Sequence, residues 1–166
     1  MSMFNNQDDS KTNESKRFLE FNLGQESYAV TLLKVREVIT PPEVTPIPKA
    51  PSYVCGLINL RGLVLTVIDL RKKLGITPHK DASQNAVIIF DLEERMVGIV
   101  VDSIQKVLNV TDEQIKPVPD SEGASAHFLG ILQHDDKLSM WIDPKQILDG
   151  HGHAHAPTPT NLKAAA

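Results

Sequence analysis

The chain repeats itself, and this repeat limits the folds it can adopt more than any other feature. Residues 18–30 recur at residues 87–99 with a shift of 69 positions and no gap. Later matches occur in the same order, with a shift that grows to 74. The matched segments are 18–23 with 87–92, 28–30 with 97–99, 46–48 with 117–119, 56–58 with 130–132 and 68–69 with 142–143. The sequence therefore predicts two related units, a first unit at about 17–78 and a second unit at about 84–149.

Each unit has the residue pattern of short strands joined by turns. Apolar residues alternate at Phe21 and Leu23 and again at Tyr28 and Val30, on either side of a polar turn, which predicts an opening hairpin. Prolines between 41 and 51 exclude a regular helix or a central strand there. A second hairpin is predicted from 56–60 with 63–68. Segment 31–39 stays open, because its apolar spacing is helical while the matching segment 100–108 is rich in β-branched residues.

Short helices are predicted to close both units. Asp69 can cap a helix at 70–74 that Gly75 ends. Asp143 can cap a helix that begins at Pro144. With about five strands per unit, the fold class is mainly β: two small five-stranded β-barrels of the SH3-like or OB-like kind, related by a pseudo-two-fold axis, with short helices. The repeat leaves open whether a strand of one unit completes the other.

The two ends of the chain lack this pattern. Residues 1–16 are polar and predict a disordered tail, and residues 150–166 predict a flexible tail that contains three histidines. We expect no metal site in that tail, because no acidic or cysteine ligand accompanies the histidines. The single cysteine, Cys55, excludes an internal disulfide, and no apolar run is long enough to span a bilayer. These features predict a cytoplasmic protein.

Sequence motifs for catalysis are lacking, so we expect no enzyme and no cofactor. None of the six histidines stands beside a plausible nucleophile, and no phosphate-binding or zinc-protease motif occurs.

The tip of the second hairpin is more informative, because it places Arg61 between Asn59 and Gly62. Arg61 either points into water or recognises a carboxylate or a backbone carbonyl through its forked guanidinium. Composition alone supports these two interpretations of Arg61 equally.

Several separated blocks resemble the CheW-like domain family of chemotaxis proteins, over residues 17–149. The blocks are 21–24, 28–30, 34–38, 56–62, 67–71, 97–102 and 114–117. The resemblance implies a fold of two five-stranded barrels. It also implies a non-enzymatic adaptor that links the cytoplasmic tips of methyl-accepting chemoreceptors to the regulatory domain of the chemotaxis histidine kinase, and that is recruited to membrane receptor arrays.

The same resemblance implies which residues bind the receptor. Val35, Glu37 and Arg61 fall where family members bind receptor, and Gly56 and Gly62 shape the hairpin together with Asn59. One departure is Thr66, where the family commonly has proline; threonine restores a backbone N–H at this position.

A double-barrel nucleic-acid-binding module is the alternative, because small barrels often bind single strands. Such surfaces need basic grooves and exposed aromatic side chains. The net charge is −4 and only 5% of residues are aromatic. Phe18, Phe21, Phe90 and Trp141 are expected in the core, which makes this alternative the weaker one.

Overall fold

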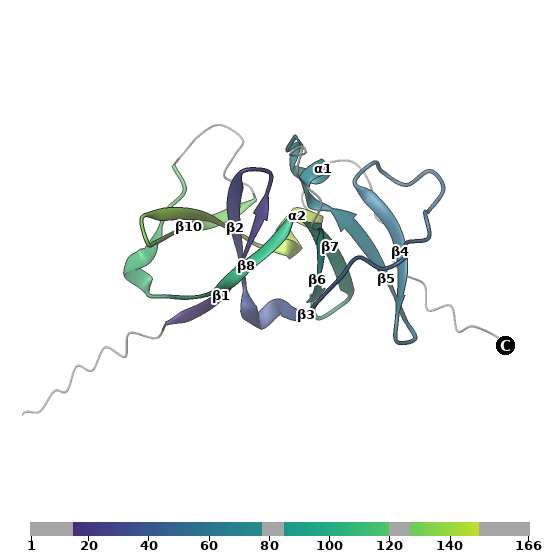
Figure 1. The fold of residues 1–166 in the computed structure, drawn as a ribbon, viewed down its shortest axis with the longest axis horizontal. Helices are drawn as coiled ribbons and strands as arrows, with labels where there is room; N and C mark the ends of the chain where they lie inside the picture. Colours follow the sequence, from purple (N-terminus) through teal and green to yellow (C-terminus); the bar gives the residue numbers. More distant parts are fainter. Residues whose placement is uncertain (1–14, 78–84, 120–126, 150–166) are drawn as a thin grey trace, which may run out of the picture.

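Two β-sheets lie side by side in the computed structural model, which describes residues 15–77, 85–119 and 127–149 (Figure 1). The predicted tails, apart from residues 15 and 16, lie outside the described residues. The first unit forms β1 (Lys16–Leu23), β2 (Glu26–Thr31), a 3₁₀ turn η1 (Leu32–Lys34), β3 (Val35–Ile39), β4 (Val54–Leu60), β5 (Leu63–Asp69) and α1 (Leu70–Leu74). The second unit forms β6 (Ala86–Asp91), β7 (Met96–Val101), β8 (Ser103–Val110), a 3₁₀ turn η2 (Asp112–Gln114), β9 (Ile115–Lys116), β10 (Phe128–His134), β11 (Lys137–Ile142) and α2 (Pro144–Asp149).

The two units exchange their opening hairpins. One sheet has the order β8-β1-β2-β11-β10-β9 and the other has the order β3-β6-β7-β5-β4. Hairpin β1–β2 therefore joins hairpin β10–β11, and hairpin β6–β7 joins hairpin β4–β5. Both joins are parallel and use equivalent residues: Tyr28 pairs with Met140 in one sheet, and Val97 pairs with Thr66 in the other. This exchange answers the question that the repeat left open.

The mainly β fold class is confirmed, whereas two closed barrels are not. In the described part of the chain, β8 and β9 are the edges of a six-stranded sheet, and β3 and β4 are the edges of a five-stranded sheet. The sixth strand of the larger sheet is the two-residue β9, which pairs with β10. At the equivalent place in the first unit there is only a single bridge, between Thr45 and Leu57. Closure of each sheet into a five-stranded barrel stays a prediction.

A shared apolar core joins the two sheets. The largest cluster contains residues of both sheets and of both helices, so neither unit buries its own core alone. Its most buried members are Leu23, Val30, Ile88, Val101 and Ile147, each at 0% exposure. Two smaller clusters are each built on one sheet, around Phe18 and Leu132 in the six-stranded sheet and around Val67 and Ile89 in the five-stranded sheet.

The predicted helix caps are confirmed. The Asp69 carboxylate accepts hydrogen bonds from the backbone N–H groups of Arg71 and Lys72, and Gly75 ends α1 with a φ of 70°. The Asp143 carboxylate accepts from the backbone N–H of Lys145, at the start of α2. Segment 31–39, which the sequence left open, contains both η1 and β3.

A buried ion pair ties the first unit to the second. Arg71 Nη1 lies 2.8 Å from Asp102 Oδ1, and both side chains are about nine-tenths buried, at 12% and 10% exposure. The other carboxylate oxygen, Asp102 Oδ2, accepts a hydrogen bond of 2.6 Å from the backbone N–H of Gly24. Asp102 therefore holds the β1–β2 turn and α1 of the first unit against the end of β7. No helix in the described part of the chain is long and apolar enough to cross a membrane.

Candidate functional site

The β4–β5 hairpin ends in a tight turn whose residues have the expected geometry. Arg61 and Gly62 occupy the turn with φ values of 51° and 87°. The side-chain oxygen of Asn59 accepts a hydrogen bond of 2.9 Å from the backbone N–H of Gly62. Two left-handed residues match the twist of the flanking strands, so the turn is a well-defined platform for the Arg61 side chain.

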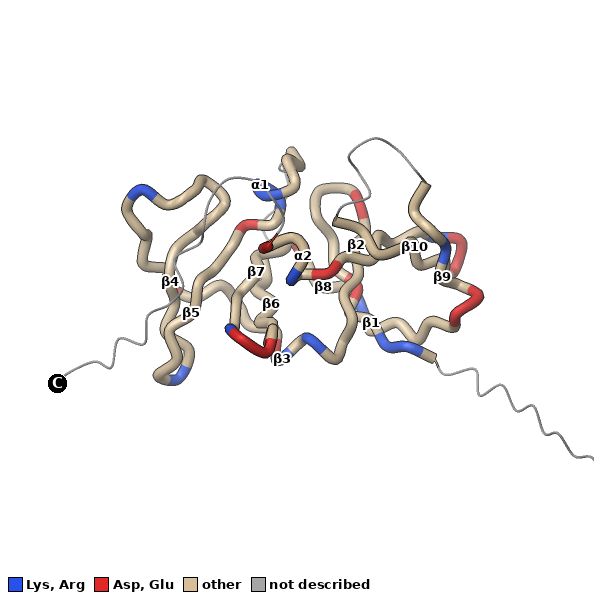
Figure 2. Tube along the Cα trace, turned by 180° about the vertical axis from the view of Figure 1, so that it is seen from behind, with Lys and Arg blue, Asp and Glu red and all other residues tan. Residues whose placement is uncertain are grey.

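Arg61 is both exposed and partnered. Its side chain is 71% exposed, and its guanidinium forms an ion pair with Glu37, whose side chain is 23% exposed. Glu37 lies in β3, one edge of the five-stranded sheet, while the hairpin carries β4, the other edge. The pair therefore connects the two edges and fixes where the guanidinium lies. Figure 2 shows the basic colour at the tip of this hairpin.

The other two predicted site residues lie in packed positions. Val35 is half-buried and packs against the shared core. Gly56 is buried in β4 with a φ of 144°, at a bulge in the pairing of β4 with β5. The structure thus brings Glu37, Asn59, Arg61 and Gly62 together at the hairpin tip.

Sequence reasoning missed an apolar flank next to this tip. Leu63 and Val64 begin β5 directly after the turn and are 46% and 49% exposed. We call the set Glu37, Arg61, Leu63 and Val64 the hairpin surface. The sequence predicts a strand at 63–68 but does not indicate which of its side chains are exposed, and the structure shows that the first two are.

The β10–β11 hairpin of the second unit has a similar turn, in which the charges are reversed. Asp135 and Asp136 have φ values of 46° and 60°, close to those of Arg61 and Gly62. Lys106 Nζ lies 3.5 Å from Asp135 Oδ2. By the repeat shifts of 69 and 74, Lys106 is equivalent to Glu37 and Asp135 is equivalent to Arg61. The two ends of the molecule therefore carry equivalent ion pairs of opposite polarity.

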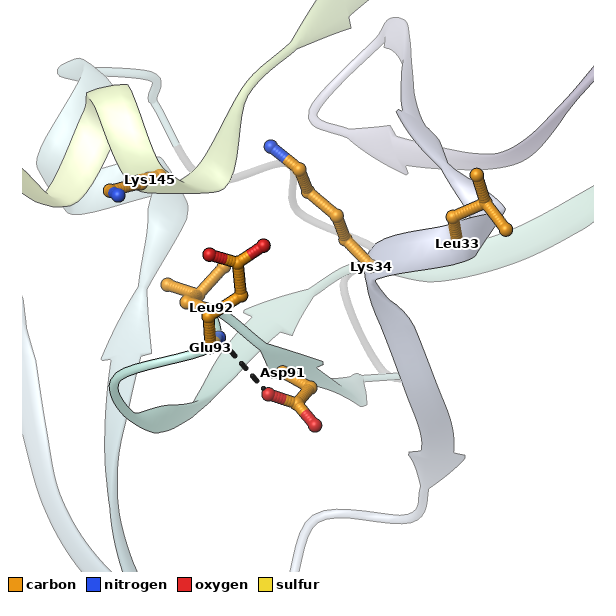
Figure 3. Close-up of a pocket in the computed structure, with 6 residues that line it drawn as sticks. All are labelled: Leu33, Lys34, Asp91, Leu92, Glu93 and Lys145. Atoms are coloured by element: carbon orange, nitrogen blue, oxygen red, sulfur yellow. Dashed lines mark hydrogen bonds between the residues drawn. The ribbon is translucent and has the colours of Figure 1, made fainter.

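An open groove of about 720 Å³ lies between η1, the β6–β7 turn and α2 (Figure 3). It is lined by Leu33, Lys34, Asp91, Leu92, Glu93 and Lys145. Lys34 Nζ is 3.0 Å from Asp143, and Asp91 accepts a hydrogen bond of 3.1 Å from the backbone N–H of Glu93. Lys34 and Asp91 therefore already have partners within the protein, and the side chains that line the groove give no indication of a catalytic site.

The structure places one histidine beside a serine, a contact that the sequence did not indicate. His134 Nε2 lies 3.1 Å from Ser139 Oγ and 3.0 Å from Glu20 Oε1. Hairpin β10–β11 and strand β1, distant in sequence, bring them together. Ser139 is 0% exposed and its hydroxyl donates a hydrogen bond to Glu20, so the hydroxyl is neither accessible to a substrate nor activated by the histidine.

The four aromatic side chains that the sequence places in the core pack within the protein. Phe18, Phe21 and Phe90 are at most 1% exposed, as expected from the sequence. Trp141 is half-buried against Phe18, with ring centroids 5.2 Å apart. The alternative of a nucleic-acid-binding module therefore gains no support from these side chains.

Cys55 lies in β4 next to the hairpin, half-buried against the cluster around Val67. Burial, and then the nearby Asp69 carboxylate, raise the pKa of the Cys55 thiol. A higher pKa leaves less thiolate at any given pH, so we predict slow alkylation of the folded protein near about pH 8. The pH–rate profile should lie to the alkaline side of the profile for the same chain in urea. Coincident profiles would contradict this prediction.

Comparison with known proteins then decides the family. A family model described as the CheW-like domain matches residues 17–151. The chain belongs to the CheW-like domain family. Among its CheW relatives, a chemotaxis protein CheW from Rhizobium meliloti is 36% identical over 109 residues, which cover 66% of this chain and 70% of the relative. A chemotaxis protein CheW from Klebsiella aerogenes is 34% identical over 135 residues, covering 80% and 81%.

A solved CheW structure has the same fold. The scaffolding protein TtCheW from Thermoanaerobacter tengcongensis superposes with a TM-score of 0.77 at 30% identity, and the match covers 84% of this chain and 96% of that one. Thr66, the departure from the family pattern, is 7% exposed and sits in β5 between Leu57 of β4 and Val97 of β7. Family membership confirms the resemblance, and the binding roles of individual residues stay predictions.

Proposed function

We propose that the protein is a non-enzymatic chemotaxis scaffold, which couples the cytoplasmic tips of chemoreceptors to the chemotaxis histidine kinase. It would work in the cytoplasm and be recruited to membrane receptor arrays. Support comes from the family and from relatives named as chemotaxis and scaffolding proteins. The observation that carries the proposal is Arg61: an exposed guanidinium, held on a tight hairpin by Glu37, beside exposed apolar side chains.

The receptor contact is assigned to the hairpin surface and its supports. Arg61 offers a forked donor to a carboxylate or to backbone carbonyls, and arginine is among the residues that dominate binding energy at interfaces. Glu37 orients that fork, and Leu63 and Val64 provide apolar area beside it. Asn59 and Gly62 fix the turn, while Gly56 and Val35 hold β4 and β3 in place.

The kinase contact is assigned to the ends of the two units. In this proposal each sheet acts as one small barrel, and the two ends are similar but unequal. Two similar but unequal ends favour docking end to end with a related barrel in the kinase, through residues other than those of the hairpin surface. Head-to-tail contacts of this kind close into rings when the rotation permits.

A three-component pull-down tests the coupling. The cytoplasmic fragment of a receptor is immobilised, and the regulatory domain of the kinase is added with and without this protein. We expect retention of the kinase domain to depend on this protein, because each of its contacts is specific for one partner. Equal retention in its absence, or no binding to either partner alone, would contradict the proposal.

A further inference from the structure

Two hairpins of the chain, the closing hairpins β4–β5 and β10–β11, each have two sheets on which they could dock. In the observed docking β10–β11 joins β2 and β4–β5 joins β7, through equivalent residues. In the alternative docking β4–β5 would join β2 and β10–β11 would join β7. The segments that connect the closing hairpins to the rest of the fold, 40–53, 75–85 and 117–127, can each span about 35 Å when extended. Chain length therefore permits both dockings, and side chains must select one.

A buried polar cluster connects β1 to the closing hairpin β10–β11. Glu20 of β1, His134 of β10 and Ser139 of β11 are 4%, 6% and 0% exposed. Ser139 Oγ donates a hydrogen bond of 2.5 Å to Glu20 Oε1, and His134 Nε2 lies 3.0 Å from the same oxygen. The histidine contact needs a proton on Nε2 only, which a neutral ring can carry. The closing hairpin thus supplies two partners to a carboxylate that is removed from water.

The five-stranded sheet has an apolar set at the same places. By the repeat shifts of 69 and 74, the equivalents of the three cluster residues are Ile89, Leu60 and Leu65. Ile89 and Leu65 are 0% and 1% exposed, and Leu60 packs against the same apolar cluster. The alternative docking would place Glu20 against Leu60 and Leu65, and a buried carboxylate without hydrogen-bond donors is strongly destabilising. The observed docking matches polar residues with polar residues and apolar residues with apolar residues.

The ion pairs at the hairpin tips discriminate in the same direction. Arg61 of the β4–β5 turn pairs with Glu37 of β3, and Asp135 of the β10–β11 turn pairs with Lys106 of β8. Strand β3 belongs to the sheet of β6–β7, and β8 belongs to the sheet of β1–β2. The alternative docking would therefore bring Arg61 to Lys106 and Asp135 to Glu37, two pairs of like charge. Because these side chains are largely exposed, we expect them to contribute less than the buried cluster.

We propose that the buried cluster and the reversed ion pairs form a matching code, which selects the sheet on which each closing hairpin docks. Specificity of this kind is a difference in free energy between matched and mismatched contacts, and it uses repulsive as well as attractive pairs. Selection by this code places the hairpin surface at the end of the molecule where Glu37 holds Arg61, whichever partner that surface binds.

The first test reproduces the mismatched contacts within the full chain. The double variant His134→Leu, Ser139→Leu presents the residues of β4–β5 to Glu20. The triple variant, which adds Glu20→Ile, restores an apolar match. We expect the double variant to melt about 10 °C or more below the wild type, and the triple variant to melt within about 3 °C of it. A double variant that melts no lower than the triple variant would show that the cluster does not discriminate, and would overturn the proposal.

The second test inverts the code. The crossed variant Glu20→Ile, Ile89→Glu exchanges residues between the two opening hairpins. Its introduced carboxylate finds its hydrogen-bond partners only in the alternative docking. NMR contacts of Tyr28 report the docking, because Tyr28 lies beside Met140 in the observed fold and would lie beside Thr66 in the alternative. We expect the crossed variant to lose the Tyr28–Met140 contact. Retention of this contact together with a wild-type melting temperature would contradict the matching code.

A rescue variant separates a changed code from a general loss of folding. It adds the exchange of the closing residues to the crossed variant: Leu60→His, Leu65→Ser, His134→Leu and Ser139→Leu. The polar cluster then lies in the five-stranded sheet, and every contact of the observed docking is matched again. We expect the Tyr28–Met140 contact to return and the melting temperature to rise by about 10 °C or more above that of the crossed variant. Absence of this rescue would overturn the proposal.

Discussion

Gly56→Ala is expected to remove much of the free energy of unfolding, by about 3 kcal/mol or more. A Cβ atom at this position would lie 2.2 Å from the carbonyl oxygen of Thr45 and 2.8 Å from a methyl group of Val44. The backbone at φ 144° is also a region that side-chain-bearing residues rarely adopt. The Thr45 backbone cannot retreat easily, because its N–H and C=O both bond to Leu57. Urea unfolding, with the midpoint and slope compared to the wild type, measures the loss.

Gly62→Ala is the matched control for this prediction. Gly62 also has a positive φ, of 87°, but nothing lies within 4 Å of the position where its Cβ would be. Only backbone strain remains, so the cost should be about 1 kcal/mol. Similar losses for the two variants would show that the close approach of Thr45 to β4 does not exist in solution.

Arg71→Met should be the second large effect, because it leaves Asp102 buried without its cation. Removing one member of a buried ion pair costs about 3–5 kcal/mol, far more than an exposed pair. Asp102 is 8% exposed and keeps only its backbone contacts, including the bond from Gly24. The β1–β2 turn should loosen together with α1, which hydrogen exchange at the amides of β1 and β2 can detect alongside the urea midpoint.

Lys145→Met tests the same change of charge at the equivalent position in α2. Lys145 is exposed, so its replacement should alter the free energy of unfolding by no more than about 0.5 kcal/mol. If Arg71→Met were as mild as this control, the link between Arg71 and Asp102 would not be a source of stability.

The repeat predicted hairpins, turns and helix caps well, because these features depend on local residue patterns. Asp69, Gly75 and Asp143 carry the capping signals in their own sequence neighbourhoods. The exchange of hairpins was beyond sequence reasoning for a physical reason. The edge of β2 can pair with β5 or with β11 using equivalent residues, and the sequence of β2 itself does not distinguish the two partners.

The site was predicted in part for similar reasons. The turn residues Asn59 and Gly62 and the exposed Arg61 follow from local chemistry, while the pairing of Arg61 with Glu37 depends on the approach of two sheet edges. The cluster of Glu20, His134 and Ser139 depends on hairpin exchange, since β1 and β11 belong to different units. Contacts between units are the part that a sequence pattern does not reveal.

The measurement that tests the central claim most directly compares receptor binding by Arg61→Ala and by Asp135→Ala, which change equivalent turn residues at opposite ends. Both variants should melt close to the wild type, because both side chains are exposed. The account predicts that Arg61→Ala weakens binding of the receptor's cytoplasmic fragment by about tenfold or more, while Asp135→Ala binds it as the wild type does. Wild-type receptor affinity for Arg61→Ala, or a melting temperature lowered by many degrees, would contradict the assignment of this hairpin as the receptor-binding surface.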